Sequence, residues 1–386
     1  MIDENENLLS LSVDQTRKKI TIWRIISLSL LVCLVTIIIL YALGVGWKKE
    51  EKKKNKEEKE EEKDYESILS LWQPGSAVFT KLIPYIKNIT DLNSKDFIPI
   101  EDRIAVFDLD GTLFCETDPI YFDWGMYAFR VLNDTSYKPS QEDIDLATKI
   151  NSAYIHDLPE GLEKNHSRRN AAVFKGMTME EFVEYTKKYL ESDSPGYNNL
   201  KRKDAFYKPM LQVIEYLQKY NFTVFIVSGT DRFTVRTIVQ GHINIPESQI
   251  IGSVSTIRAE NQGDKEGIDY QFEPGEKVVL GGGFVIKNVK MNKISTMNTE
   301  IGKKPVLSFG NSSGDKSMSN YIVNDNKYKS LAFMLCCDDT ERENGNVTRA
   351  DGMKKLCEQY NWQPISMKND WKTIYGDNVT RKKIFS

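Results

Sequence analysis

The segment Val106-Phe107-Asp108-Leu109-Asp110-Gly111-Thr112 constrains the fold more than any other part of this sequence. It closes an apolar run at Ile104–Phe107, which is typical of a buried β-strand, and it places two carboxylates two residues apart directly after that run. In an open α/β sheet, reactive groups collect beyond the carboxyl ends of the strands, where loop N–H groups receive anions. We therefore expect Asp108 and Asp110 at that edge, suited to phosphate transfer. A strand followed by an ordinary Asp-Gly turn is the alternative for this motif alone.

Two later apolar runs end in polar loops of complementary chemistry. The run Thr223–Val227 leads into Ser228-Gly229-Thr230, where a hydroxyl and neighbouring N–H groups can hold a phosphate oxygen. The run 305–309 leads into a glycine-rich loop that ends at Asp315. A carboxylate there can reach Mg²⁺, which prefers hard oxygen ligands. Each loop alone is equally consistent with a polar turn.

A lysine between these two segments can supply positive charge to the same edge. Lys293 lies at the predicted start of a helix over Ile294–Ile301, where it can neutralise the nucleophile and a transferring phosphoryl group. Lys290 is the near alternative, and a solvated surface lysine is the simpler interpretation of either.

The order of the remaining elements predicts a Rossmann-like parallel sheet covered by helices on both faces. Apolar runs typical of strands recur at residues 222–227, 278–285, 306–309 and 331–335, and helical periods occur at 144–155, 179–190 and 209–220. A long, mostly helical insertion, about residues 115–206, separates the first strand from the second. We expect it to form a cap over the site, since long connections in compact domains usually have a function.

The amino-terminal region predicts a membrane anchor and a stalk. Residues 25–47 contain no charged side chain, so they can cross a bilayer as one helix. A cleaved signal peptide is the alternative, but the long polar segment over residues 1–24 favours an uncleaved anchor. Residues 48–64 carry eight basic and eight acidic side chains and predict a solvated stalk. The catalytic domain is expected over residues 65–386.

Composition excludes other classes of protein. The formal net charge is −3, so a nucleic-acid partner has no electrostatic support. The five cysteines lack the spacing of a disulfide framework and are interpreted as thiols.

Strand ends that carry Asp/Asp, Ser, Lys and Asp, in this order, resemble the haloacid dehalogenase (HAD) superfamily of aspartate-nucleophile phosphotransferases. The stretches Asp102–Glu116, Lys175-Gly-Met-Thr, Ile301-Gly-Lys-Lys-Pro and Phe309–Asp315 are similar to a bacterial subgroup described as phosphoserine-phosphatase-like. The resemblance covers roughly residue 71 to the carboxyl terminus. It implies a HAD core with an inserted helical cap, preceded here by one transmembrane helix.

The resemblance also implies roles for individual residues in a magnesium-dependent phosphatase. Asp108 matches the nucleophile that becomes an aspartyl phosphate, and Asp110 matches the acid/base that serves the leaving oxygen and then water. Ser228, with Gly229, matches the phosphate-binding segment. Lys293 matches the charge-neutralising lysine.

The implied magnesium ligands are the Asp108 side chain, the Asp110 main-chain oxygen, Asp315 and Asn311. Asn311 departs from the family pattern, because many relatives carry an acidic residue there. The site therefore has one negative charge fewer, and we expect weaker magnesium affinity.

The expected substrate is a small phosphomonoester, with phosphoserine and phosphorylcholine as the two candidates. Glu116 matches the position of a glutamate near the substrate ammonium group in phosphoserine phosphatases. Tyr121, Phe122 and Trp124 can form an aromatic surface for a quaternary amine or can simply pack the cap. Transfer to a second substrate, as in mutases of the superfamily, and a catalytically silent membrane-tethered binding protein are the alternative functions.

The membrane orientation has two conflicting indications. Lysines crowd the carboxyl-terminal flank of the apolar run, and the positive-inside rule would place that flank in the cytoplasm. Relatives of the resembling subgroup commonly carry export signals. We expect a single-pass protein with its catalytic domain outside the cytoplasm.

Overall fold

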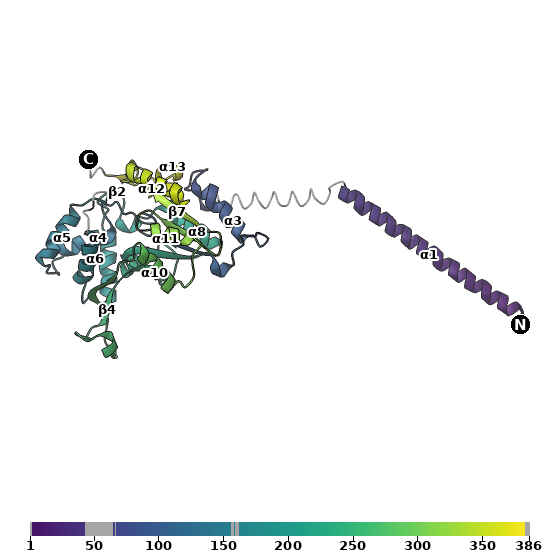
Figure 1. Cartoon of the computed structure of the whole chain (residues 1–386), viewed down its shortest axis with the longest axis horizontal. Helices are drawn as coiled ribbons and strands as arrows, with labels where there is room; N and C mark the ends of the chain where they lie inside the picture. The colour runs from purple at the N-terminus through teal and green to yellow at the C-terminus, as the bar shows by residue number, and fades with distance from the viewer. Residues whose placement is uncertain (1, 43–64, 66, 156–157, 159–161, 383–386) are drawn as a thin grey trace. The chain divides into compact units, whose positions relative to one another are not determined.

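The computed structural model describes residues 2–42, 65, 67–155, 158 and 162–382 (Figure 1). The chain divides into two compact units, residues 1–67 and residues 68–386. Among the described residues, the first unit contains the long helix α1, and the second contains the seven-stranded sheet. The sequence motifs for phosphate chemistry all lie in the second unit.

The amino-terminal unit is built on one long helix, α1 (Ile2–Ala42). Its stretch Thr16–Tyr41 has a mean hydropathy of 2.5 and is exposed throughout, and it is long and apolar enough to cross a membrane. Most of the predicted polar segment 1–24 is therefore helical and continuous with the apolar stretch. The predicted stalk at 48–64, and residues 43–47 of the predicted span, lie outside the described residues.

A seven-stranded sheet forms the centre of the second unit, in the order β5-β4-β3-β1-β6-β7-β8. All neighbouring pairs are parallel except β4 and β5, which form an antiparallel hairpin. The seven strands are β1 (Ile104–Phe107), β3 (Thr223–Asp231), β4 (Ile250–Ala259), β5 (Val278–Ile286), β6 (Leu307–Gly310), β7 (Leu331–Cys336) and β8 (Gln363–Ser366). The prediction of a Rossmann-like, largely parallel sheet is confirmed.

Helices and shorter elements connect and cover these strands. The helices of the second unit are α3 (Ile83–Thr90), α4 (Phe122–Leu132), α5 (Gln141–Asn151), α6 (Leu162–Val173), α7 (Met179–Leu190), α8 (Lys208–Lys219), α9 (Arg232–Val239), α10 (Met291–Glu300), α11 (Lys316–Val323), α12 (Val347–Tyr360) and α13 (Met367–Asp370). A π-helical turn, η1 (Val78–Leu82), precedes α3 directly. A separate two-stranded ribbon pairs β2 (Tyr197–Asn198) with β9 (Thr380–Arg381).

Strand β1 lies at the middle of the sheet because all four of its side chains are apolar and buried. Its last residue, Phe107, pairs with Ile226 of β3 on one side and with Phe309 of β6 on the other. The rings of Phe107 and Phe309 stack with centroids 4.3 Å apart, and Phe333 of β7 continues the stack at 4.9 Å. This register brings the residues that follow β1 and β6 to the same edge of the sheet as the last residues of β3, Ser228 to Asp231, which the sequence had predicted as a loop.

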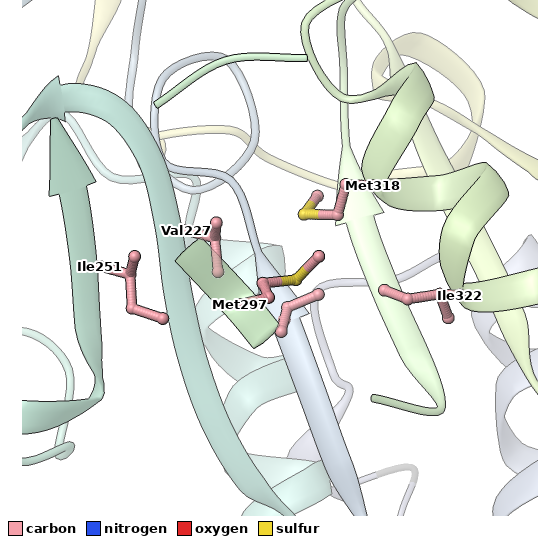
Figure 2. Close-up of a cluster of buried hydrophobic side chains, with 6 residues drawn as sticks. Val227, Ile251, Met297, Met318 and Ile322 are labelled. Carbon is pink, nitrogen blue, oxygen red and sulfur yellow. The ribbon is translucent and has the colours of Figure 1, made fainter. Parts of the chain in front are cut away.

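Helices α10 and α11 pack on the sheet through a buried apolar cluster (Figure 2). Met297 of α10 and Met318 and Ile322 of α11 meet strand side chains such as Val227 and Ile251, and none of the five is exposed to solvent. Burial of side chains of this size contributes about 1.5–3 kcal/mol each. The packing fixes the amino-terminal ends of both helices. Lys293 lies in the first turn of α10, and α11 begins directly after Asp315.

Two strands of the sheet were absent from the sequence prediction, β4 and β8. Strand β8 is an edge strand with the sequence Gln-Pro-Ile-Ser, of which only Ile365 is buried. A strand paired on one side does not need a continuous apolar run, and its proline does not interrupt a central ladder. The predicted strand near 278–285 is present as β5, but it is the antiparallel member of the hairpin.

The inserted segment near 115–206 contains α4, α5, α6 and α7, as predicted for a mostly helical cap. The cap reaches the β4–β5 hairpin, where Gly176 N–H donates to Leu280 O and Leu280 N–H donates to Met177 O, both at 2.8 Å. Its first linker is held by Glu343, a fully buried carboxylate that accepts from the hydroxyls of Thr117, Tyr197 and Tyr375. The cap is thus tied to the core at places far apart in the sequence.

Candidate active site

The site begins at the carboxyl end of β1. Asp108 N–H donates to Phe309 O at 2.9 Å, so the sheet ladder continues to the carboxylate-bearing residue and fixes its backbone. Gly111 then turns the chain with φ of 74°, where a Cβ would lie only 1.8 Å from Asn311 Nδ2. Only glycine allows the turn and this close approach of the two loops. Asp108 and Asp110 are each 7% exposed.

Lys293 joins two strand ends through its ammonium group. Its Nζ lies 2.6 Å from Asp108 Oδ1 and 2.6 Å from Asp315 Oδ1, and all three side chains are buried. Burial and the neighbouring Asp315 raise the pKa of Asp108 to about 7, although Lys293 opposes the shift. Burial alone would lower the pKa of Lys293, but the two carboxylates outweigh it and raise that pKa. Two carboxylates against one ammonium leave a place for further positive charge.

The structure places Lys290 and Lys293, between which the sequence left the choice open, in different surroundings. Lys293 is 2% exposed and lies between the two carboxylates, whereas Lys290 precedes α10 with an exposed side chain. Asp108 and Asp315 therefore form ion pairs with Lys293, which lies on the buried face of α10.

Asp110 is held from β3. Thr230 Oγ1 donates to Asp110 Oδ2 at 2.8 Å, whereas Asp110 Oδ1 is buried and has no hydrogen-bond partner among the described residues. Burial raises the pKa of Asp110, and the Thr230 and Ser228 hydroxyls limit that rise. Ser228, the predicted phosphate-binding residue, is fully buried and its Oγ accepts from Thr230 N–H at 3.0 Å. Thr230 was not singled out from the sequence, although it completes the Ser-Gly-Thr segment.

The loop after β6 wraps around Asp315. Its Oδ2 accepts from the N–H groups of Asn311 and Ser312 at 3.1 Å each and from the Ser312 hydroxyl at 3.2 Å. The side chain of Asn311 instead donates from Nδ2 to Glu116 Oε1 at 2.9 Å. Burial, and then the charge of Asp110, raise the pKa of Glu116 well above its usual range. Glu116 and Asn311 are thus partners of each other.

The oxygen atoms gathered at this edge are of the kinds that bind a magnesium ion. Among the described residues no three His, Cys, Asp or Glu side chains form a cluster that could hold a metal, and Lys293 stands between Asp108 and Asp315. Carboxylate, amide and main-chain oxygens are nevertheless the hard ligands that Mg²⁺ takes in proteins. The buried, unpartnered Oδ1 of Asp110 shows that this edge has more acceptor atoms than donors.

A cavity of about 340 Å³ opens over these groups. Its core wall includes Asp108 and Asp110, which follow β1, together with Gly229, Thr230, Lys293 and the 312–315 loop. The cations Lys287, Lys290 and Arg349 also line it. The cap contributes aromatic and acidic side chains, namely Tyr121, Trp124, Glu116, Asp123 and Glu163. The cavity is therefore bounded by core and cap together, as a reaction chamber requires.

The predicted aromatic surface is only partly directed at this cavity. The rings of Tyr121 and Trp124 line it, with centroids 5.6 Å apart. Phe122 instead packs against Tyr189 inside the cap, 5.1 Å between centroids. A larger and mostly apolar cavity of about 640 Å³ lies on that side, and Tyr121 lines both cavities. The smaller cavity is the candidate active site because the ionisable groups converge there.

Comparison with known proteins agrees with this geometry. Residues 105–265 match the family model described as HAD, haloacid dehalogenase-like hydrolase. No curated protein matches the chain. The match covers the segment that carries Asp108, Asp110 and Ser228, and it agrees with the resemblance drawn from the strand-end motifs and with a hydrolase.

Solved structures with similarity to the chain have low identity. A conserved protein of unknown function from Anaerococcus prevotii DSM 20548 is 14% identical, with a TM-score of 0.46 over 78% of this chain and 96% of that one. Cytosolic 5'-nucleotidase IIIB bound to cytidine is 12% identical, with a TM-score of 0.45 over 76% and 88%. A phosphoserine phosphohydrolase-like protein from Francisella tularensis subsp. tularensis SCHU S4 is 13% identical, with a TM-score of 0.36 over 65% and 92%.

Proposed function

We propose that this protein is a magnesium-dependent phosphomonoester hydrolase that acts through an aspartyl-phosphate intermediate on a small phosphorylated metabolite, with phosphoserine and phosphorylcholine as candidate substrates. The observation that carries the proposal is Lys293 held at 2.6 Å from both Asp108 and Asp315, beside Asp110 at the same strand edge. Phosphoryl transfer depends on positioning and on neutralising the equatorial oxygens, and these groups supply both.

In the first step a carboxylate oxygen of Asp108 attacks phosphorus, and the bond from phosphorus to the leaving oxygen breaks. Asp110 gives its proton to that oxygen, and burial, which raises its pKa, favours the protonated form needed for this. In the second step a water attacks phosphorus, its proton passes to Asp110, and the Asp108–phosphorus bond breaks to release phosphate. The hydroxyl of Thr230 keeps Asp110 in one orientation throughout.

The surrounding residues hold the phosphoryl group. Lys293 neutralises charge on the nucleophile and on the transferring group, and Gly229 lines the cavity as the proposed phosphate-binding backbone. Asp108, Asp315, Asn311 and the main-chain oxygen of Asp110 would hold Mg²⁺, which supplies positive charge for the phosphate oxygens. Because Asn311 replaces an acidic residue and is bound to Glu116, we propose a weakly held ion.

Phosphate release by the full-length protein in detergent tests the proposal. We expect turnover of at least one ester in a panel that includes phosphoserine and phosphorylcholine, and we expect chelation of Mg²⁺ to reduce it at least about 100-fold, with recovery when Mg²⁺ is returned. Turnover that survives chelation would exclude the metal-dependent mechanism. A phosphorylated acceptor in place of free phosphate would identify a phosphotransferase, and a folded protein inactive on every ester would identify a tethered binding protein.

We further propose that α1 anchors the protein in a membrane as a single span, with the catalytic domain outside the cytoplasm. The exposed apolar stretch Thr16–Tyr41 supports the anchor. Protease added to intact cells should then degrade the catalytic domain without lysis, while a cytoplasmic control protein stays intact. Protection of the domain until the cells are lysed would reverse the orientation, and release of the domain by a salt wash would exclude the anchor.

A further inference from the structure

Lys290 has a backbone conformation that a lysine rarely adopts. Its φ is 55° and its ψ is −125°, in a region that glycine occupies and that crowds the Cβ of other residues. Among the described residues, five other than glycine have positive φ, and the other four are asparagine or aspartate: Asn199, Asn221, Asp325 and Asn361. Short polar side chains tolerate such φ values far better than a lysine does. Lys290 is therefore the exception in this chain.

The neighbouring contacts explain how the strained backbone persists. Lys290 N–H donates to Gly314 O at 2.9 Å, and Lys293 N–H donates back to Lys290 O at 3.2 Å. The residue thus links the loop around Asp315 to the first turn of α10. A glycine would satisfy the same two hydrogen bonds without strain. Strained residues cluster at ligand-binding sites, where the side chain itself is required.

The side chain of Lys290 lines the active-site cavity and is exposed. Its ammonium group has no hydrogen bond or ion pair with any residue in the described part of the chain. Lys293 differs, because Asp108 and Asp315 already engage its Nζ. The unengaged ammonium of Lys290 is available to a ligand, and it adds to the positive charge of Lys287 and Arg349 on the same cavity.

Acidic side chains line the cavity from both sides, because Asp108, Asp110 and Asp315 lie on the core wall. The acidic cap residues Glu116, Asp123 and Glu163 line the cavity from the cap side, and Glu116 is already engaged by Asn311. The core side carries Lys290 beside the catalytic groups. A cavity of about 340 Å³ exceeds what a phosphoryl group alone fills, so the leaving group also meets these walls.

We propose that Lys290 is a specificity-determining residue that binds a second anionic group, such as a carboxylate, on the leaving group of the phosphomonoester. The inference rests on the proposed phosphatase function and adds to it the class of substrate. Lys290 contacts the substrate in this scheme but takes no part in bond making. The strained backbone is retained because glycine, which would fit without strain, lacks the ammonium group.

Two matched pairs of esters test this inference. 3-Phosphoglycerate and glycerol 3-phosphate differ by a carboxylate, and so do phosphoserine and phosphoethanolamine. We expect the full-length protein with Mg²⁺ to prefer the carboxylate member of each pair by about tenfold or more in kcat/KM, the scale of one lost charged hydrogen bond. Lys290→Gly should reduce that ratio to near one, mainly through KM, whereas Lys290→Arg should keep most of it.

Thermal unfolding separates this role from a structural one. Because Lys290→Gly relieves backbone strain, we expect its Tm to be equal to that of the native chain or up to about 4 °C higher. Asp325→Gly is the matched control, since Asp325 also has positive φ but does not line the cavity. That control should leave the preference between esters as it is in the native chain.

An equal rate on both members of each pair, or a preference that survives Lys290→Gly, would overturn the inference. A fall in Tm of Lys290→Gly would show that the lysine is there for stability. Absence of all turnover would instead contradict the proposed phosphatase function. In that case, calorimetric Kd values for 3-phosphoglycerate and glycerol 3-phosphate, with and without Lys290→Gly, still decide whether Lys290 binds the carboxylate.

Discussion

Replacing Asp108 by asparagine is expected to reduce phosphate release by about 10⁴-fold or more. The amide cannot attack phosphorus as a carboxylate does, so the first covalent step is lost. The fold should persist, because asparagine has the same shape and Lys293 keeps its contact with Asp315. Steady-state phosphate release, with Tm measured on the same samples, checks both expectations.

Asp264→Asn is the control for this substitution, since Asp264 is exposed in the connection between β4 and β5. It makes the same chemical change away from the cavity and should retain full activity. An Asp108→Asn protein that kept more than a tenth of the native rate would exclude Asp108 as the nucleophile.

Replacing Lys293 by methionine is expected to impair both stability and turnover. Asp108 and Asp315 would then face each other in a buried site without their shared cation. Breaking a buried ion pair from one side costs about 3–5 kcal/mol. Turnover should fall by roughly 10³-fold, as when a group that stabilises transition-state charge is removed. Lys303→Met is the control, because its exposed pair with Asp102 contributes at most about 1 kcal/mol.

The loss of stability in Lys293→Met should depend on pH with a defined sign. Burial and Asp315 already raise the pKa of Asp108 from its usual range to about 7, and we expect it to rise further without the lysine. A carboxyl whose folded pKa is raised contributes stability below its unfolded pKa and loses it as pH rises through the folded value. Chemical unfolding should therefore show a larger deficit at pH 8 than at pH 5. An equal deficit at both values would mean that the carboxylates do not titrate in the variant.

Much of the active site could be predicted because its residues directly follow buried strands. Asp108 follows the fully apolar β1. Because the carboxyl ends of neighbouring parallel strands meet at one edge, the position of each residue after a predicted strand was enough to predict that Asp108, Ser228 and Asp315 lie near one another. The distinction between the two lysines was also accessible. Lys293 and Met297 are four residues apart on α10 and share its buried face, whereas Lys290 precedes the helix.

Other parts of the site depend on tertiary contacts that leave no local pattern. Glu343 lies in a loop after β7, and only the folded chain brings Thr117, Tyr197 and Tyr375 to its carboxylate. Asn311 was predicted as a metal ligand from its position, but its bond to Glu116 depends on two loops that meet beside Gly111. The unusual backbone of Lys290 is likewise fixed by its hydrogen bond to Gly314 O. No glycine at position 290 reveals the positive φ in the sequence.

The pairing of β9 with β2 makes the far end of the chain a part of the cap. Thr380 and Arg381 pair with the Tyr197–Asn198 segment, and Lys382 N–H donates to Gly196 O at 2.8 Å. We therefore expect a probe attached near residue 382 to report on the cap segment and not on the sheet that carries Asp108. We also expect a bulky fusion at this position to act on the cap segment first, so that phosphate release slows although every residue proposed to make or break bonds is intact.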